Sequence, residues 1–277
     1  MAEIEGLVLA LREGDDAAKT AAAEALGNLA CDNDANDVAI AEAGGIPLLV
    51  ELLRDGSAEA IADAAWALRN LACNDDNRVL IAEAGAIPLL VDLLRDGSAD
   101  AKEEAACALC NLSCNDAIRV LIAEAGGIPP LVQLVRDGSA DAKLEAAWAL
   151  RNLGCDNGDN QVLIAGAGGI APLVELLRDG SAEAKAEAAR ARDSLAWNSD
   201  ANAVAIAATV GLEALVELAR RGRVTVDELS VVRDAGDHAK RKAALVVAAL
   251  LRACVPDELR SRADVRDVIR GVIGAHL

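Results

Sequence analysis

The sequence contains an internal repeat with a period of about 41 residues. The string Arg-Asp-Gly-Ser-Ala begins at Arg54, Arg95, Arg136 and Arg178, so successive copies lie 41, 41 and 42 residues apart. A period of this length is typical of solenoids, in which one unit is too small to bury its own apolar face and stacked units form a continuous core. The chain is therefore expected to be an extended array of similar layers.

Each unit is expected to contain three helices. In the second unit these are predicted over the following residue ranges: about 77–84, 88–95 and 98–114. Pro88 stands where the middle helix begins, because a missing N–H costs nothing there. Gly97 is expected to end that helix in the left-handed conformation, and Ser98 to cap the third helix. Since this pattern recurs, the array is predicted to occupy residues 1–220, as a partial N-terminal unit and about five repeats. Residues 221–277 are read as a degenerate repeat and a C-terminal helical cap.

Composition agrees with a helical array. Apolar residues make up 53% of the 277 residues, yet the chain has no Phe, no Tyr and only three Trp. The apolar content is thus mainly Ala, Leu, Val and Ile, and few alternating strand patterns are present. Ala favours helices that pack closely. The sequence predicts an all-α fold.

Charge and cysteine usage restrict the partners. The formal net charge of −18 disfavours nucleic-acid backbones and anionic membrane surfaces. No stretch reaches the roughly 18 unbroken apolar residues of a membrane span. Seven cysteines without a disulfide-like framework favour a reducing compartment, which predicts a cytoplasmic or nuclear protein. The oligomeric state is left open.

The expected second and third helices contain the strings AIPLLVDLL from Ala86 and AAWALRNLAC from Ala64. By these strings the repeat resembles the armadillo repeat of importin-alpha, beta-catenin and many plant and protist proteins. The resemblance covers about residues 3–220, with a weaker tail to 277. It implies a right-handed superhelical solenoid of three-helix repeats, with a concave groove lined by the third helices.

The resemblance also implies particular groove residues. In that family an Asn of the third helix binds the backbone of an extended peptide, and a Trp one turn earlier forms part of a side-chain pocket. The Asn position is held here by Asn28, Asn70, Asn111, Asn152 and, as a departure, Ser194. The Trp position is held by Trp66 and Trp148, with Glu24, Cys107 and Arg190 in the other units. Arg69 and Arg151 precede the Asn position and are candidate contacts at the groove edge, and the preferred ligand charge is left open.

The chemistry of a carboxamide is compatible with this role. Trp66 and Asn70 are four residues apart and therefore share one face of a helix. An Asn side chain has one acceptor and two donor hydrogens, so it can bond both the N–H and the C=O of a peptide. The groove interpretation requires these amides to face solvent on the inner wall. The alternative is that they satisfy backbone groups between neighbouring helices and that the tryptophans pack between repeats.

The predicted function is a protein- or peptide-binding scaffold. It would hold an extended segment of a partner in the groove. The alternative is a structural subunit of a larger assembly that contacts partners through its convex face or its C-terminal tail. No enzyme, catalytic residue, cofactor or metal is predicted, because His238 and His276 have no evident catalytic companion and no phosphate loop is present.

The cysteines suggest two interpretations. Cys31, Cys73, Cys114 and Cys155 occupy equivalent positions and are expected to be small core residues. Cys107 and Cys110 break the repeat and lie with Cys114 at i, i+3 and i+7 on one helix. Such a trio is an alternative site for a soft metal or for redox chemistry, although no fourth ligand is evident.

Overall fold

The computed structural model describes residues 2–197, 199–206 and 208–209. Within these ranges the secondary structure is helical and no strand occurs. The helix that was predicted to open the array is α1 (Ala2–Glu13). Residues 210–220, at the end of the predicted array, and the predicted cap over 221–277 lie outside the described residues.

The described helices fall into three classes that alternate along the chain. The first helices of the units are α3 (Asp34–Glu42), α6 (Asp75–Glu83), α9 (Asp116–Glu124) and α12 (Gly158–Gly166). The second helices are α1, α4 (Gly45–Asp55), α7 (Ala86–Asp96), α10 (Ile128–Asp137) and α13 (Ile170–Asp179). The third helices are α2 (Asp16–Ala30), α5 (Ala58–Leu71), α8 (Ala99–Leu112), α11 (Ala140–Gly154) and α14 (Ala182–Ala196). This order confirms the predicted all-α solenoid of three-helix units.

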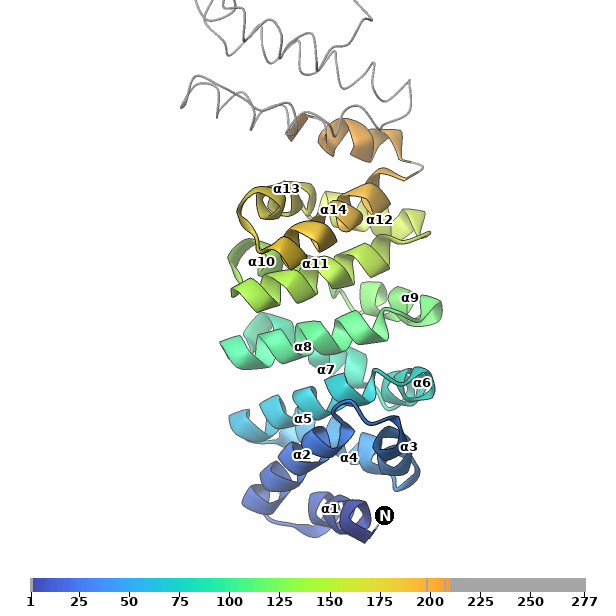
Figure 1. Cartoon of the computed structure of the whole chain (residues 1–277), viewed down its shortest axis with the longest axis vertical. Coiled ribbons are helices and arrows are strands. Elements are labelled where there is room, and N and C mark those ends of the chain that lie inside the picture. The colour runs from blue at the N-terminus through green and yellow to red at the C-terminus, as the bar shows by residue number, and fades with distance from the viewer. Residues whose placement is uncertain (1, 198, 207, 210–277) are drawn as a thin grey trace, which may run out of the picture.

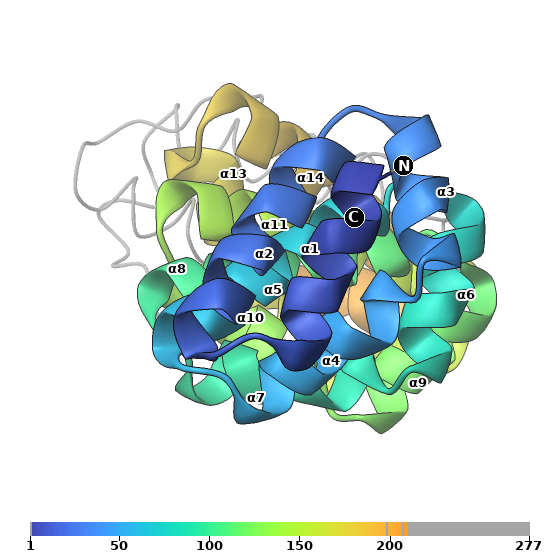
Figure 2. The same ribbon diagram turned by 90° about the horizontal axis from the view of Figure 1, so that it is seen from below.

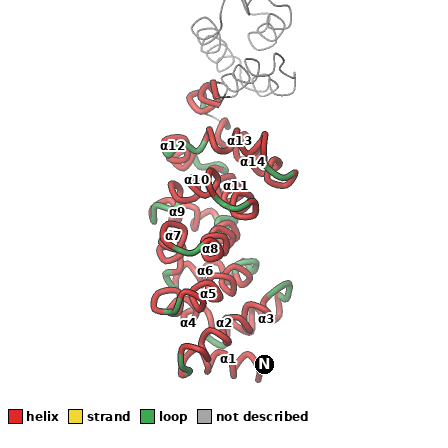
Figure 3. Tube along the Cα trace, turned by 90° about the vertical axis from the view of Figure 1, so that its left-hand side faces the viewer, coloured by secondary structure: helices red, strands yellow, loops and turns green. Residues whose placement is uncertain are grey.

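The units stack as layers along one axis, each layer containing one third helix. Figure 1 shows α2, α5, α8, α11 and α14 following one another, with the first helices α3, α6 and α9 in a column along one edge. The view along the axis places α3, α6 and α9 on the same side of the molecule (Figure 2). In the tube view this column turns about the axis from α3 to α12 (Figure 3). Each third helix contacts the third helix of the next layer.

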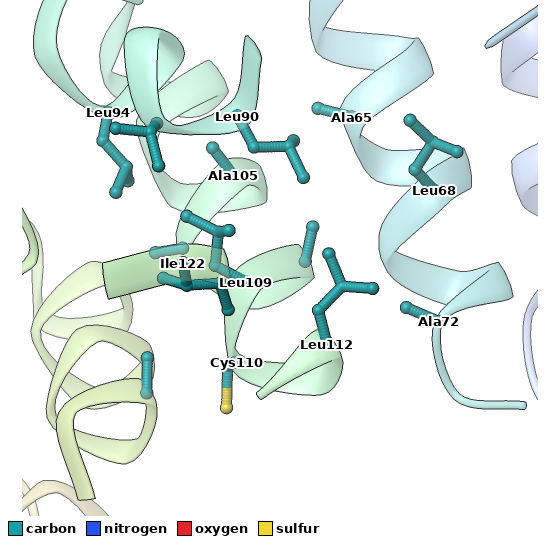
Figure 4. Close-up of a cluster of buried hydrophobic side chains, with 14 of the residues drawn as sticks. Ala65, Leu68, Ala72, Leu90, Leu94, Ala105, Leu109, Cys110, Leu112 and Ile122 are labelled. Carbon is teal, nitrogen blue, oxygen red and sulfur yellow. The ribbon is translucent and has the colours of Figure 1, made fainter. Parts of the chain in front are cut away.

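A single apolar core runs through all these layers. Buried side chains from Ile4 in α1 to Ile206 belong to one contiguous cluster. Figure 4 shows part of it, where Leu68 of α5, Leu90 of α7 and Leu109 of α8 lie in one region. All three side chains are fully buried. Since each layer supplies only part of the cluster, the layers stabilise one another.

Helix caps recur once per layer, as the sequence predicts. Ser98 accepts a hydrogen bond from the backbone N–H of Ala101 at 3.2 Å, and α8 begins directly after it. The same cap is made by Ser57, Ser139 and Ser181. Asn side chains cap the first helices in the same way: Asn33, Asn74, Asn115 and Asn157. These bonds satisfy backbone donors that a helix start leaves free.

One backbone expectation is wrong. Gly97 has φ −68° and ψ 167°, which is extended rather than left-handed. The left-handed glycine of this unit is Gly85, with φ 81°, in the break between α6 and α7. Gly97 is still required for space, because a Cβ there would lie 2.5 Å from the carbonyl oxygen of Leu93. The middle helix also begins at Ala86, two residues before Pro88.

A second expectation is wrong for the equivalent cysteines. Cys31, Cys73, Cys114 and Cys155 are exposed rather than part of the core. They follow the last residues of the third helices, where the chain leaves the packed stripe. Their regular spacing therefore follows from the repeat period and does not indicate that their side chains are buried.

No single helix in the described part of the chain is long and apolar enough to cross a membrane. Two pairs of consecutive helices, α9 with α10 and α12 with α13, would have the length and apolar composition of a membrane span if each pair is taken as one segment. The helices of these pairs are bent relative to each other by 86° and 79°.

Candidate functional site

The candidate site is one longitudinal stripe of the third helices, here called the third-helix face. In α5 the stripe comprises Asp63, Trp66 and Asn70, which lie at i, i+3 and i+7 and therefore share a side of the helix. The equivalent residues in the next layers are Glu104, Cys107 and Asn111, then Glu145, Trp148 and Asn152, then Glu187, Arg190 and Ser194. The stack of third helices aligns these stripes along the array.

The Asn position forms a ladder of bonds between layers. Each side chain bonds the backbone carbonyl oxygen of the residue that precedes the Asn position one layer earlier. The pairs are Asn70 Nδ2 to Gly27 O (3.0 Å), Asn111 Nδ2 to Arg69 O (2.9 Å), Asn152 Nδ2 to Cys110 O (3.4 Å) and Ser194 Oγ to Arg151 O (3.4 Å). The structure therefore contains the interlayer bonds of the alternative interpretation.

This bond uses only part of each amide. Asn70 and Asn111 are half-buried, and Asn28 is exposed. Among the described residues, Asn70 has no further hydrogen-bond partner, and Asn111 has only the Cys73 sulfur at 3.6 Å as a second acceptor. Asn70 therefore keeps its Oδ1 acceptor and one Nδ2 hydrogen, and Asn111 keeps its Oδ1 acceptor and an Nδ2 hydrogen whose other partner is only the weakly accepting Cys73 sulfur. The interlayer bond holds the amide in one orientation with these groups still available.

Asn152 differs from the other amides, and the expected solvent-facing carboxamide is not found there. Its residue is only 9% exposed. Its Nδ2 lies 3.0 Å from the buried Ser113 hydroxyl, 3.4 Å from Cys110 O and 3.8 Å from Cys114 Sγ. The position equivalent to Ser113 one layer earlier is Ala72, which has no side-chain acceptor. The Ser113 hydroxyl therefore gives the Asn152 amide a buried hydrogen-bond partner that Asn111 does not have.

The two tryptophans are placed differently. Trp66 is half-buried and lies against Gly27 of the preceding layer, where an added Cβ would come within 2.7 Å of Trp66 Cε3. Trp148 is 38% exposed. Gly27 thus contacts the Trp66 ring and accepts the Asn70 hydrogen bond, which links both side chains to one residue of the preceding layer.

The arginines of the candidate site have partners within the chain. Arg69 Nη1 lies 3.0 Å from Glu104 Oε2, and Arg151 Nη1 lies 3.0 Å from Glu187 Oε2. Each pair joins one layer to the next, and Glu187 also pairs with Arg190. Because these guanidinium charges are already compensated, their capacity to attract an acidic ligand is reduced.

Asp63 and Glu145 of the third-helix face form no such pair with another described residue. Gly27 and Cys110 stand at the arginine position in the layers that precede Asp63 and Glu145. Burial raises the pKa of Asp63, and the nearby Glu24 and Glu59 carboxylates raise it further. Burial also raises the pKa of Glu145, against the lowering effect of Arg69 and of hydrogen bonds from Cys110 and Cys107. A cation on this face would relieve the cost of both charges.

The three thiols do not support the metal or redox alternative, and Cys114 lies beyond the end of α8 rather than on the same helix. Cys107 and Cys110 are buried, whereas Cys114 is exposed. Burial, followed by the charge of Glu145, raises the pKa of both Cys107 and Cys110, which disfavours the reactive thiolate. In the portion of the chain described here, no group of three or more His, Cys, Asp or Glu side chains could hold a metal ion.

Sequence reasoning missed the acidic column of the third-helix face. Its members are Asp63, Glu104, Glu145 and Glu187, at intervals of 41, 41 and 42 residues. That spacing is visible in the sequence. It does not indicate that Glu104 and Glu187 form salt bridges with arginines of the preceding layer.

Comparison with known families and structures assigns the repeats. The family model described as "Armadillo/beta-catenin-like repeat" matches residues 33–73, 74–114 and 115–154. No curated protein gives a significant match to the sequence.

Solved structures resemble the whole array. One described as computationally designed armadillo repeat proteins for modular peptide recognition has a TM-score of 0.73 and 27% identity, covering 89% of this chain and 99% of its own. A designed armadillo repeat protein in complex with the peptide (KR)4 has a TM-score of 0.65 and 26% identity, covering 98% and 99%. An engineered protein has a TM-score of 0.76 and 28% identity, covering 98% of this chain and 67% of its own.

Proposed function

Because this chain carries consecutive armadillo repeats within an armadillo-type solenoid, we propose that its third-helix face binds an extended segment of a partner protein. Asn70 and Asn111 bond the backbone of that segment, and Trp66 and Trp148 line pockets for its side chains. Asn28 extends the row at its exposed end, and Asn152 contributes less because it is buried. The proposed role is that of a non-catalytic scaffold without a cofactor.

The observation that carries the proposal is the partial use of the half-buried amides. An Oδ1 acceptor and a donor hydrogen are the groups needed to bond the N–H and the C=O of one peptide unit. Their orientation is held in advance by the bonds to Gly27 O and Arg69 O. Preorganisation of this kind reduces the entropy lost on binding.

Electrostatics favours a ligand with basic side chains. Burial raises the pKa values of Asp63 and Glu145, and the arginines Arg69 and Arg151 of this face are already paired with Glu104 and Glu187. A Lys or Arg side chain of the ligand would compensate these carboxylates. The designed neighbour that binds (KR)4 gives a suitable probe composition.

A variant pair separates ligand binding from layer stability. Ser194 keeps the interlayer bond with a hydroxyl, so Asn70→Ser with Asn111→Ser should preserve that bond while removing the groups available to a ligand. We expect this double variant to bind a fluorescent (KR)4 peptide about tenfold more weakly in an anisotropy titration. Gln133→Ala, at an exposed position of α10 away from the third-helix face, serves as the matched control.

The net charge makes this comparison decisive. A chain of charge −18 attracts a basic peptide nonspecifically, but the Asn→Ser changes leave the charge unaltered. Equal affinity for wild type and the folded double variant would refute backbone recognition at this face. A (DE)4 peptide that bound as well as (KR)4 would refute the preference for basic ligands.

A further inference from the structure

A second surface of the molecule carries a regular apolar pattern outside the third-helix face. The first helices present a Val–Leu pair to solvent: Val79 and Leu80 in α6, Val120 and Leu121 in α9, and Val162 and Leu163 in α12, each between 42% and 65% exposed. In α3 the pair is reduced to Val38, which is 44% exposed. We call these seven side chains the first-helix ridge. They follow the column of first helices along one edge of the array (Figure 1).

The core does not need these side chains. The next residue of each pair is an isoleucine, Ile81, Ile122 and Ile164, and each of these is fully buried. The isoleucine therefore supplies the contact with the second and third helices, while the pair points away from the layer. Single exposed apolar residues are common, but the same exposed pair in three consecutive layers is a repeated apolar pattern of the kind that marks an interface.

Carboxylates border the ridge at both ends of the first helices. Exposed aspartates lie in the first turns, and among these Asp75 and Asp116 are paired with Arg78 and Arg119 of their own helices. At the other end, Glu42, Glu83 and Glu124 are the last residues of α3, α6 and α9 and are exposed. These glutamates have no salt-bridge partner within the described ranges.

The position of the glutamates is unfavourable for the helices themselves. A carboxylate in the last turn faces the negative end of the helix dipole, and this interaction is unfavourable. Helix stability therefore gives no reason for the same residue type at this place in three layers. A partner that brings positive charge to this border does give a reason.

Taken together, the pattern specifies one kind of occupant. We propose that the first-helix ridge is a docking surface for an amphipathic helix of a partner protein, with an apolar stripe flanked by Lys and Arg. A second copy of this chain would oppose like charges along the borders, as would an anionic membrane. Helices in packing contact lie about 8–10 Å apart, so the three layer steps from α3 to α12 span at least roughly 25–30 Å, the length of a helix of about 17–20 residues.

The test uses a synthetic probe helix and its scrambled counterpart. The probe is a labelled 20-residue peptide with leucines at a and d positions and lysines on both flanks. The counterpart has the same composition without the stripe. We expect the full chain to bind the probe at least about tenfold more tightly than the counterpart, because only the probe can bury the ridge. Equal binding of the two peptides would mean charge attraction alone and would overturn the proposal.

Variants of the chain locate the contact. Leu80→Gln with Leu121→Gln should weaken the probe at least about tenfold. Leu9→Gln changes an equally exposed leucine of α1 outside the ridge and should leave binding unchanged. Glu83→Gln with Glu124→Gln should weaken binding severalfold and reduce its dependence on salt. Circular dichroism confirms that each variant is folded, which is expected because the changed side chains are exposed.

Two further outcomes discriminate the alternatives. Asn70→Ser with Asn111→Ser should not affect the probe, since the ridge is independent of the third-helix face; a loss there would assign the probe to that face and contradict the proposal. In sedimentation experiments, the wild-type chain and the Leu80→Gln, Leu121→Gln double variant should have the same mass. Dissociation of a wild-type dimer by this variant would identify a second copy as the occupant instead.

Discussion

Asn111 of α8 donates a hydrogen bond from Nδ2 to the backbone carbonyl oxygen of Arg69 in α5, across a distance of 2.9 Å. The same relation joins Asn70 to Gly27 one layer earlier. The two residues that are proposed to contact a ligand therefore also form hydrogen bonds between layers. Both interpretations that the sequence allowed for these amides are consequently compatible, because the interlayer bond occupies one donor hydrogen and the ligand would use the remaining groups.

Removal of the Asn111 amide should destabilise the array. Asn111→Ala deletes the bond to Arg69 O and leaves that carbonyl only the weak Cys73 thiol donor at 4.0 Å, so we expect a loss of about 1 kcal/mol in the free energy of unfolding. Urea denaturation followed by circular dichroism measures this change. Asn28→Ala is the matched control, since Asn28 is exposed and makes no side-chain hydrogen bond to another described residue. A similar loss in both variants would contradict an interlayer role for Asn111.

Neutralisation of Asp37 should stabilise the N-terminal layers. Asp37 is only 1% exposed, its Oδ1 has no hydrogen-bond partner among the described residues, and burial followed by the Asp34 charge raises its pKa to about 6. A raised pKa means that the folded state favours the protonated form, so stability is lost as pH rises through about 6. Asp37→Asn should therefore add about 2–3 kcal/mol at pH 8.

The pH dependence provides the check on this prediction. At about pH 3, below the unfolded-state pKa of about 3.9, the carboxyl is largely protonated in both the folded and the unfolded chain, so most of the gain from Asp37→Asn should disappear. Urea titrations at about pH 3 and about pH 8 measure the two values. Glu42→Gln, an exposed change in the same helix, should show no comparable difference. A gain that is independent of pH would exclude charge burial as its cause.

A methyl group at Gly27 should displace the Trp66 ring. The added Cβ would lie 2.7 Å from Trp66 Cε3 and 2.9 Å from Cζ3, which is too close for unshifted atoms. We expect Gly27→Ala to cost about 1–3 kcal/mol and to change the Trp fluorescence spectrum. Gly6→Ala in α1 meets nothing within 4 Å and should instead stabilise by about 0.5–1 kcal/mol through helix propensity. Stabilisation by both changes would place the Trp66 ring elsewhere.

The cysteines should divide into fast and slow classes. Iodoacetamide attacks the thiolate, so the buried Cys107 and Cys110, whose pKa values are raised, should be alkylated at least about tenfold more slowly than Cys31 and Cys155. Peptide mass spectrometry after timed labelling gives the rates. The difference should vanish in guanidinium chloride. Rapid labelling of Cys110 in the folded chain would revive the redox interpretation of α8.

The layers of this fold could be predicted because their signals are local and repeated. The N-caps at Ser57, Ser98 and Ser139 and the period of the Arg-Asp-Gly-Ser-Ala string depend only on neighbouring residues, and the structure confirms them. The conformation of Gly97 could not be predicted in this way. Glycine is required there by the closeness of the Leu93 carbonyl and not by a positive φ, and a sequence does not distinguish the two reasons.

The candidate site was less predictable because its contacts join layers. The partners of Asn70 and Arg69 lie 43 and 35 residues away, and such pairing depends on how one helix sits upon the next. Asn152 is equivalent to Asn70 by position, yet the Ser113 hydroxyl in the neighbouring layer draws its amide inward. Equivalent positions in a repeat thus have different surroundings whenever the adjacent unit differs.

The ladder of Asn bonds has a direction, because every amide reaches back to the layer before it and none of these bonds reaches forward. Each binding group is therefore oriented by the unit on its N-terminal side. A unit moved to the front of a rearranged array would lose this orientation, whereas a unit added at the rear would acquire it. The order of repeats, and not only their number, then determines how many ligand positions are ready to bind.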